Sequence, residues 1–266
     1  MSALAKWISY ANYQLWLFAG LGLVLWLWSP GGPGGPPRAV YEWAVQQDPS
    51  FALGHRVLAG LDEDEHRDLV ALMHYRAASE AEPSDHTTCL AHGKLAEKLE
   101  MNEEALKAYQ CAVEHDPANG PAHGRYAAML QRKGELGPAG EEFRRALALD
   151  PSDDQARLGL GVNLAASGRF AEATPYLELA AQHLPNDADA AFNLGLLYRK
   201  QGKNPEALRT LEHTVQLDPH RTPAWGNLLE LELQLGAQDL ARQHLQLWLQ
   251  VDPQNPAAQQ FVGQLQ

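Results

Sequence analysis

Asp150-Pro151 belongs to a set of dipeptides that recur through this sequence at a fixed interval. The others are Asp48-Pro49, Glu82-Pro83, Asp116-Pro117, Leu184-Pro185, Asp218-Pro219 and Asp252-Pro253. Each proline lies 34 residues after the previous one, without an insertion or deletion. A period of this length is typical of stacked helix–turn–helix units. Proline cannot continue a helix interior, so each dipeptide marks the boundary between two units.

Three further positions keep the same frame. Twelve residues before six of the prolines stands an alanine: Ala71, Ala105, Ala139, Ala173, Ala207 and Ala241. Eight residues before them stands a large apolar residue: Tyr75, Tyr109, Phe143, Leu177, Leu211 and Leu245. Twenty-four residues before them stands a small residue in five units and leucine in the sixth: Ala59, Gly93, Ala127, Gly161, Gly195 and Leu229. The spacing places alanine and the large residue on one helix face, and the small residue lets two helices approach closely.

This pattern resembles that of the tetratricopeptide repeat (TPR) family. The resemblance implies an all-α fold, a right-handed solenoid of helix–turn–helix repeats. It covers residues 52–255 as six repeats: 52–85, 86–119, 120–153, 154–187, 188–221 and 222–255. Residues 38–51 match a half repeat, and residues 256–266 match a C-terminal capping helix whose polar face carries several glutamines.

Both ends of the array depart from the pattern. Leu229 replaces the small residue and Trp248 replaces a small residue in the sixth repeat, and Asp62 replaces an apolar residue in the first. We therefore expect the ends to pack differently from the middle.

The N-terminal segment, residues 1–28, differs in composition from the repeats. Residues 7–28 contain no charge and carry tryptophans at both ends. A helix of this length would span about 33 Å, close to the roughly 30 Å hydrocarbon core of a membrane. We expect an uncleaved transmembrane anchor; the alternative is a cleaved signal peptide, for which the sequence offers a poor cleavage site. The Pro/Gly-rich residues 29–37 are a linker.

The charged residues limit the class of partner and indicate the orientation of the expected anchor. The net charge of −12 makes nucleic acid an improbable partner, because phosphate binding requires a basic face. Lys6 precedes the expected anchor and Arg38 is the first positive charge after it, so the positive-inside rule favours a cytoplasmic N-terminus and a periplasmic TPR domain. An organellar membrane with the repeats in the cytosol stays open.

No catalytic or metal-binding motif stands out, and we expect neither an enzyme nor a cofactor. The eleven histidines are scattered, without a His-Glu-x-x-His pair. The acidic run from Asp62 to His66 lacks the spacing of a calcium loop, and we interpret it as a solvated turn.

Cys89 and Cys111 lie near the start of one helix and the end of the next. In an antiparallel helical hairpin these two ends lie side by side, so a disulfide between Cys89 and Cys111 is one interpretation. The preferred interpretation is two buried apolar residues.

The resemblance places the first helix of each repeat on a concave groove, which is the candidate partner-binding site. There we expect an apolar patch on the inner surface, formed by Leu158, Val162, Phe192 and Leu196. Asn193 and Asn227 occupy equivalent places, where many TPR proteins use an asparagine amide to hold a ligand's backbone. Four basic residues border the same region: Arg125, Arg132, Arg199 and Lys200. The alternative is that the asparagines and the patch serve packing within the repeats.

These features predict a membrane-anchored adaptor or assembly factor that binds a partner protein or peptide in its groove, similar to single-anchor periplasmic TPR assembly factors. The alternative is a permanent structural subunit of a large membrane complex, which would use its convex surface as well. We expect no small-molecule substrate.

Overall fold

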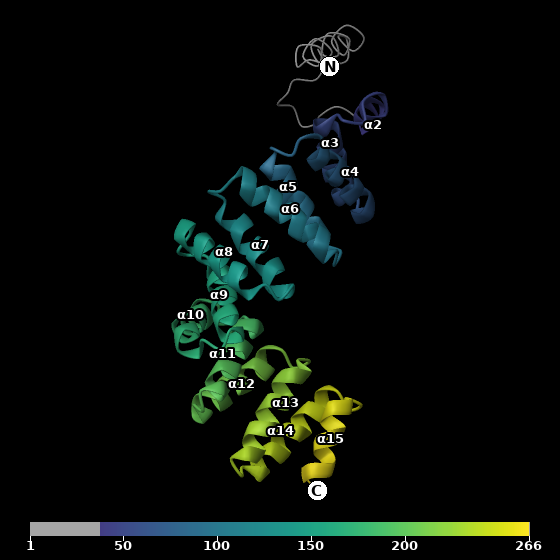
Figure 1. Ribbon diagram of the computed structural model, residues 1–266. Coiled ribbons are helices and arrows are strands. Elements are labelled where there is room, and N and C mark those ends of the chain that lie inside the picture. Colours follow the sequence, from purple (N-terminus) through teal and green to yellow (C-terminus); the bar gives the residue numbers. More distant parts are fainter. Residues whose placement is uncertain (1–37, 266) are drawn as a thin grey trace. The chain divides into compact units, whose positions relative to one another are not determined.

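The computed structural model describes residues 38–265 of the chain (Figure 1). The expected anchor at residues 7–28 and the linker at residues 29–37 therefore lie outside the described residues. Within residues 38–265, no helix combines the length and the apolar character needed to cross a membrane.

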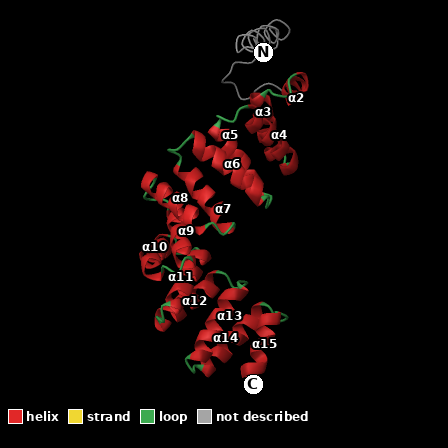
Figure 2. Ribbon diagram, in the orientation of Figure 1, coloured by secondary structure: helices red, strands yellow, loops and turns green. Residues whose placement is uncertain are grey.

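Residues 38–265 are all-α, with fourteen helices and no strand, as predicted (Figure 2). The chain begins with α2 (Arg38–Gln47) and ends with α15 (Pro256–Leu265). The first helices of the repeats are α3 (Ala52–Asp64), α5 (His86–Lys98), α7 (Gly120–Arg132), α9 (Asp154–Ala166), α11 (Ala188–Lys200) and α13 (Thr222–Gln234). The second helices are α4 (Asp68–Ala81), α6 (Asn102–His115), α8 (Leu136–Leu149), α10 (Phe170–His183), α12 (Asn204–Leu217) and α14 (Gln238–Val251).

The helices group into two compact units, one ending at Cys111 and one beginning at Ala112. In the first unit, α3 packs against α2 and α4, and α4 packs against α5. In the second unit, α7, α9, α11 and α13 each pack against the second helix of their own repeat, and α9, α11 and α13 also pack against that of the repeat before. Each first helix of this unit also contacts the next one, from α7 through α9, α11 and α13 to α15. The first helices of the second unit thus form one continuous face.

The recurring residues of the sequence form the core. All six recurring alanines are completely buried, and the six large residues eight positions before the prolines are at most 7% exposed. The small residue of the first helix packs directly against this large residue, so a larger side chain would collide there. A Cβ added to Gly161, for example, would lie 2.7 Å from the side chain of Leu177. These positions confirm the predicted interior of the hairpins.

The proline dipeptide has a structural role on both of its sides. The carboxylate of Asp150 accepts a hydrogen bond from the backbone N–H of Ser152 at 2.9 Å, which closes the turn. Two residues after the proline, Asp153 accepts from the N–H of Ala156 at 2.9 Å and caps α9. A capping side chain at this position satisfies an N–H that the helix itself leaves free. The same position caps a helix in four other places: Asp85, Asn119, Asp187 and Asn255.

The C-terminal end packs differently from the middle, as expected. The indole of Trp248 is 1% exposed and stacks on Trp225, with ring centroids 6.2 Å apart. Phe261 of α15 covers the other end of this aromatic cluster, 6.2 Å from Trp248. The glutamines at 259, 260 and 264 lie exposed on α15, which gives the array a polar end.

The prediction of a solvated acidic turn was wrong for Asp62. This residue lies within α3 and has no exposed surface. Its carboxylate pairs with Arg38 at 2.6 Å and with Arg67 at 2.7 Å. A buried carboxylate needs such partners because burial alone disfavours the charged form. The sequence could not show this, since Arg38 is 24 residues away.

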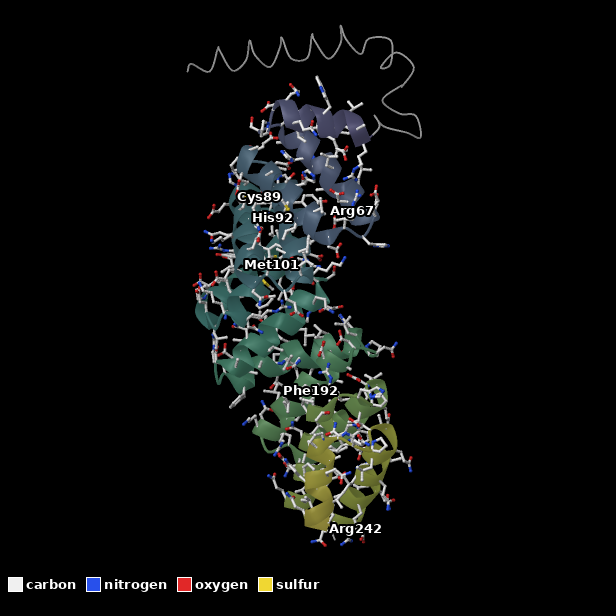
Figure 3. All side chains as sticks on the ribbon, turned by 90° about the vertical axis from the view of Figure 1, so that its right-hand side faces the viewer. Arg67, Cys89, His92, Met101, Phe192 and Arg242 are labelled. Atoms are coloured by element: carbon white, nitrogen blue, oxygen red, sulfur yellow. A yellow bond between two sulfur atoms is a disulfide. The ribbon has the colours of Figure 1, made fainter. Side chains whose placement is uncertain are left out.

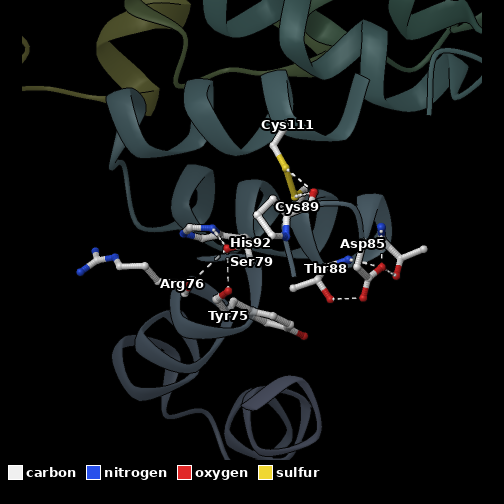
Figure 4. Close-up of a disulfide and its surroundings, with 10 residues drawn as sticks. Tyr75, Arg76, Ser79, Asp85, Thr88, Cys89, His92 and Cys111 are labelled. Carbon is white, nitrogen blue, oxygen red and sulfur yellow. Dashed lines mark hydrogen bonds between the residues drawn. A yellow bond between two sulfur atoms is a disulfide. The ribbon is translucent and has the colours of Figure 1, made fainter. Parts of the chain in front are cut away.

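The two cysteines form a disulfide between α5 and α6 (Figure 4). Their Cα atoms are 5.9 Å apart, within the range that a disulfide spans. The preferred interpretation from the sequence, two separate buried thiols, was therefore wrong. Only Cys89 is fully buried, whereas Cys111 is half-buried.

Candidate partner-binding face

The candidate face is the surface that α9, α11 and α13 share in the second unit. Leu158 does not belong to its open part, contrary to the prediction. Its side chain is 7% exposed and lies in the core cluster that includes Ala190 and Leu194 of α11. Because α9 contacts α11, the side of α9 that carries Leu158 is covered. A contact between successive first helices cannot be read from one repeat alone.

The other three apolar residues of the predicted patch are half-buried: Val162, Phe192 and Leu196. Val162 packs against the core cluster that contains Leu164, and Phe192 packs against the core cluster that contains Trp225. The guanidinium of Arg221 lies over the Phe192 ring, 5.2 Å from its centroid. Figure 3 marks the position of Phe192. A cation above an aromatic ring is attracted by the ring's negative face. The patch is therefore half-buried, and Arg221 covers part of it at Phe192.

The two asparagines are held in the same way, 34 residues apart. The Asn193 amide nitrogen donates to the carbonyl of Asp189 at 2.8 Å. The Asn227 amide nitrogen donates to the carbonyl of Pro223, also at 2.8 Å. In each case the acceptor is four residues earlier on the same helix, so both amides have a fixed orientation.

The basic residues differ in their surroundings. Arg199 spans from α11 to α13, donating to the oxygen of Asn227 at 2.5 Å and to Glu230 at 2.9 Å. Lys200 is exposed at the end of α11. Arg125 and Arg132 are exposed on α7, two helices away from α11 along the face. Arg199 therefore touches an asparagine of the predicted site.

Arg221 is a residue of this face that the sequence analysis missed. It donates to Asp189 of α11 at 2.5 Å and to Asp218 at 3.4 Å. Burial opposes its charge, but the nearby carboxylates of Asp189 and Asp218 raise the pKa of Arg221 above its ordinary value. The sequence did contain a signal for Arg221: it occupies the N-cap position at which other repeats carry a capping residue such as Asp187.

The face ends in a hollow of about 350 Å³ between α13 and α15. Its walls are Thr222, Pro223, Gly226, Asn227 and Glu230 on α13, with Ala257, Gln260, Phe261 and Gln264 on α15. The lining combines amide, carboxylate and hydroxyl groups with an aromatic ring. Such a set can hydrogen-bond a polypeptide backbone and hold one apolar side chain.

A larger hollow of about 710 Å³ lies in the first unit beside the disulfide. Three of its polar lining residues pair with one another: Glu104 accepts from Arg76 at 2.7 Å and lies 2.8 Å from the His92 ring nitrogen. The hydrogen bond from Arg76 lowers the pKa of Glu104 below its ordinary value, although burial opposes the shift. These charges already satisfy one another, so the second unit offers the better candidate face.

Two family models of this repeat type match the chain. One, the middle TPR-like domain of cilia and flagella-associated protein 70, matches residues 89–218. The other, a tetratricopeptide repeat model, matches residues 198–265. A comparison with curated protein sequences finds no match.

Several solved structures have the same fold at low sequence identity. YrrB, described as a TPR protein with an unusual peptide-binding site, is 24% identical, with a TM-score of 0.58 over 69% of this chain and 95% of its own. PilW, a type IV pilus biogenesis factor, is 19% identical, with a TM-score of 0.68 over 79% of this chain and 98% of its own. PilF of Pseudomonas aeruginosa is 17% identical, with a TM-score of 0.64 over 82% and 99%.

Proposed function

From the tetratricopeptide repeat fold of this chain, we propose that it is a protein-interaction scaffold. Its second unit binds an extended or helical segment of a partner protein along α9, α11 and α13. The observation that carries the proposal is the matched pair of amides at Asn193 and Asn227, held by the same hydrogen bond on successive first helices. Fixed groups lose little freedom on binding, so such a pair is suited to hold a peptide backbone.

The asparagine pair sets the register of the partner, and apolar contacts supply most of the affinity. The Asn193 oxygen accepts no hydrogen bond within residues 38–265, so it is available to a backbone N–H of a partner. A neutral hydrogen bond adds only about 0.5–1.5 kcal/mol net. A fully buried large apolar side chain contributes about 1.5–3 kcal/mol, and the hollow beside Phe261 can take one from the partner.

The charge of the face favours a partner with an acidic flank. Lys200 is exposed and forms no ion pair with the described residues, and it stands beside Arg199 at the end of α11. Arg125 and Arg132 extend this basic border along α7. Binding through such a border speeds association and makes it sensitive to salt. If the partner associated equally fast at high ionic strength, this basic border would have no role in binding.

We further propose that residues 7–28 anchor the protein in a membrane, with the repeats in an oxidising compartment such as the periplasm. The uncharged segment and its flanking tryptophans support the anchor. The Cys89–Cys111 disulfide supports the compartment, because disulfides persist mainly in oxidising surroundings. Intact-mass measurement of the purified protein tests the anchor, and a mature N-terminus near Gly31 would contradict it.

Site-specific cross-linking tests the binding face. A photo-reactive amino acid at Leu196, on α11, is expected to cross-link a partner in the native host. The same amino acid at Leu179, which is 37% exposed on the second helix α10, is the control. The cross-link at residue 196 should weaken when both Asn193 and Asn227 are replaced by alanine. A partner that cross-links equally at residue 179 would support a permanent subunit that uses both faces.

A further inference from the structure

We infer that Glu212, Glu232 and His244 form a binding site for a divalent transition-metal ion, with Zn²⁺ the best match. The three residues come from α12, α13 and α14 of the second unit. One ligand atom of each lies within 4.8 Å of the others. Two carboxylates and one imidazole are a donor set that zinc accepts, with a water in the fourth place. The sequence analysis predicted no metal site, because these residues lie on three different helices.

The buried carboxyl group of Glu232 is the first reason for the site. Its side chain has no exposed surface, although the same place in the four preceding repeats holds an uncharged residue: Ala96, Leu130, Leu164 and Tyr198. One oxygen accepts from His244 Nδ1 at 2.5 Å. The other oxygen is buried and has no hydrogen-bond partner within the described residues. A buried carboxylate oxygen without a partner is costly, and a cation removes that cost.

The balance of charge is the second reason. The corresponding acid of the first repeat, Asp62, is neutralised by Arg38 and Arg67. No arginine or lysine pairs with Glu232 in the described part of the chain. Instead, a second acid stands nearby: Glu212, which makes no hydrogen bond or salt bridge within residues 38–265. Two carboxylates facing one imidazole leave negative charge that a divalent cation would balance.

The surroundings suit a zinc ion with one open position. Glu212 and His244 are half-buried, so water can reach the site from their side. The His244 ring is flanked by Trp225, with centroids 6.4 Å apart. Zinc bonds of about 2.0–2.2 Å would hold tetrahedral ligand atoms about 3.3 Å apart. When the ion enters, the proton between His244 Nδ1 and Glu232 is released to solvent, and the contact has to widen by less than 1 Å. An imidazole ligand favours zinc over magnesium or calcium, which prefer oxygen.

Metal titration of the full-length protein tests the site. After removal of metals with a chelator, Zn²⁺ is added and binding is measured by calorimetry, with Co²⁺ as a visible-absorbance probe. We expect one Zn²⁺ whose affinity falls at least tenfold in Glu212→Gln and in His244→Gln. The control is His213→Gln, which removes an exposed imidazole next to Glu212 and should leave the affinity unchanged.

A second variant separates metal binding from folding. Glu232→Leu restores the side chain that the third and fourth repeats carry, as Leu130 and Leu164, so we expect it to fold and to lose the Zn²⁺. Circular dichroism checks the fold. Absence of Zn²⁺ binding by the unmodified protein would overturn the inference. So would equal affinity in the unmodified protein, Glu212→Gln and Glu232→Leu, since the ion would then sit elsewhere.

Discussion

Asp62 and Glu232 occupy the same position of the first and the sixth repeat, and both side chains are completely buried. Each faces a histidine that follows twelve residues later. His74 Nε2 lies 3.7 Å from Asp62, and His244 Nδ1 lies 2.5 Å from Glu232. In the repeats between them, the acid position carries uncharged residues. The two end repeats therefore bury a carboxyl group where the repeats between them carry an uncharged residue.

The ion pairs of Asp62 lead to a prediction about the first unit. Replacing both Arg38 and Arg67 by glutamine leaves a buried carboxylate without a compensating charge. We expect the free energy of unfolding to fall by about 3–5 kcal/mol, the usual cost of breaking a buried pair. Each single substitution should cost less, because the other arginine remains within 2.7 Å of the carboxylate. Urea unfolding measures the difference.

The control for this prediction removes the charge itself. Asp62→Leu in the background of the double variant gives the first repeat the side chain that Leu130 and Leu164 supply in the third and fourth. Most of the lost stability should return, since an apolar residue needs no partner there. A triple variant as unstable as the double variant would show that the arginines act through other contacts.

We expect His74 to make the first unit sensitive to acid. Burial lowers its pKa, and the neighbouring His55 and Arg38 lower it further, while Asp62 and Glu42 oppose the shift. The unfolded chain takes up a proton here at about pH 6.5. Below that pH the unfolded state binds more protons than the folded state. The contribution of neutral His74 to the free energy of unfolding is therefore fully present above about pH 6.5 and is lost as the pH falls.

Unfolding in urea at pH 7.5 and pH 5.5 measures this dependence. His74→Gln should reduce the difference in unfolding free energy between the two pH values, by at most about 1.4 kcal/mol per pH unit. His220→Gln, which removes an exposed histidine, is the control and should keep the dependence of the unmodified protein. The same slope in both variants would assign the acid sensitivity to other groups.

The repeating core could be predicted because every copy solves the same packing problem. An alanine at six equivalent positions, such as Ala139, and a large residue four positions later mark a buried helix stripe whatever the partner is. The proline dipeptide marks the boundaries for a similarly local reason. Contacts within one hairpin therefore follow from one repeat of sequence.

The remaining features depend on contacts of individual residues outside the repeated pattern, which the period does not encode. Leu158 was expected on the inner surface, but α11 covers it. Asp62 was expected in a solvated turn, but arginines from α2 and from the following turn reach it. The face also contains Arg221, the last residue of the fifth repeat, whose partners Phe192 and Asp189 lie at the start of the same repeat on α11. The roles of the candidate face residues in binding stay predictions.

Gly161 offers a test of the close approach between helices. Its added Cβ would lie 2.7 Å from the side chain of Leu177 and 3.3 Å from its backbone nitrogen. We expect Gly161→Ala to lower the free energy of unfolding by about 1–3 kcal/mol through overpacking. The matched control is Gly226→Ala, also within a first helix, where a Cβ meets no atom within 4 Å. That change should stabilise the protein by up to about 1 kcal/mol, because alanine favours helix. Equal effects of the two changes would mean that helix propensity alone acts at Gly161.

The Cys89–Cys111 disulfide gives a prediction about redox conditions. The bond joins residues 22 apart, and cross-linking a loop of that size restricts the unfolded chain. The stabilisation expected from this restriction is about 3 kcal/mol. Urea unfolding with and without a reducing agent should show this difference, and hydrogen exchange should localise the loss to α5 and α6.

A variant without either thiol separates the disulfide from side effects of the reducing agent. With both Cys89 and Cys111 replaced by alanine, the protein should match the stability of the reduced form to within about 1 kcal/mol, the cost of a small change in packing. It should not respond to the reducing agent at all. Mass mapping of the native protein under non-reducing conditions checks the bond directly. Two thiols open to alkylation in the folded protein would contradict it, and would also remove the support that the bond gives to an oxidising compartment.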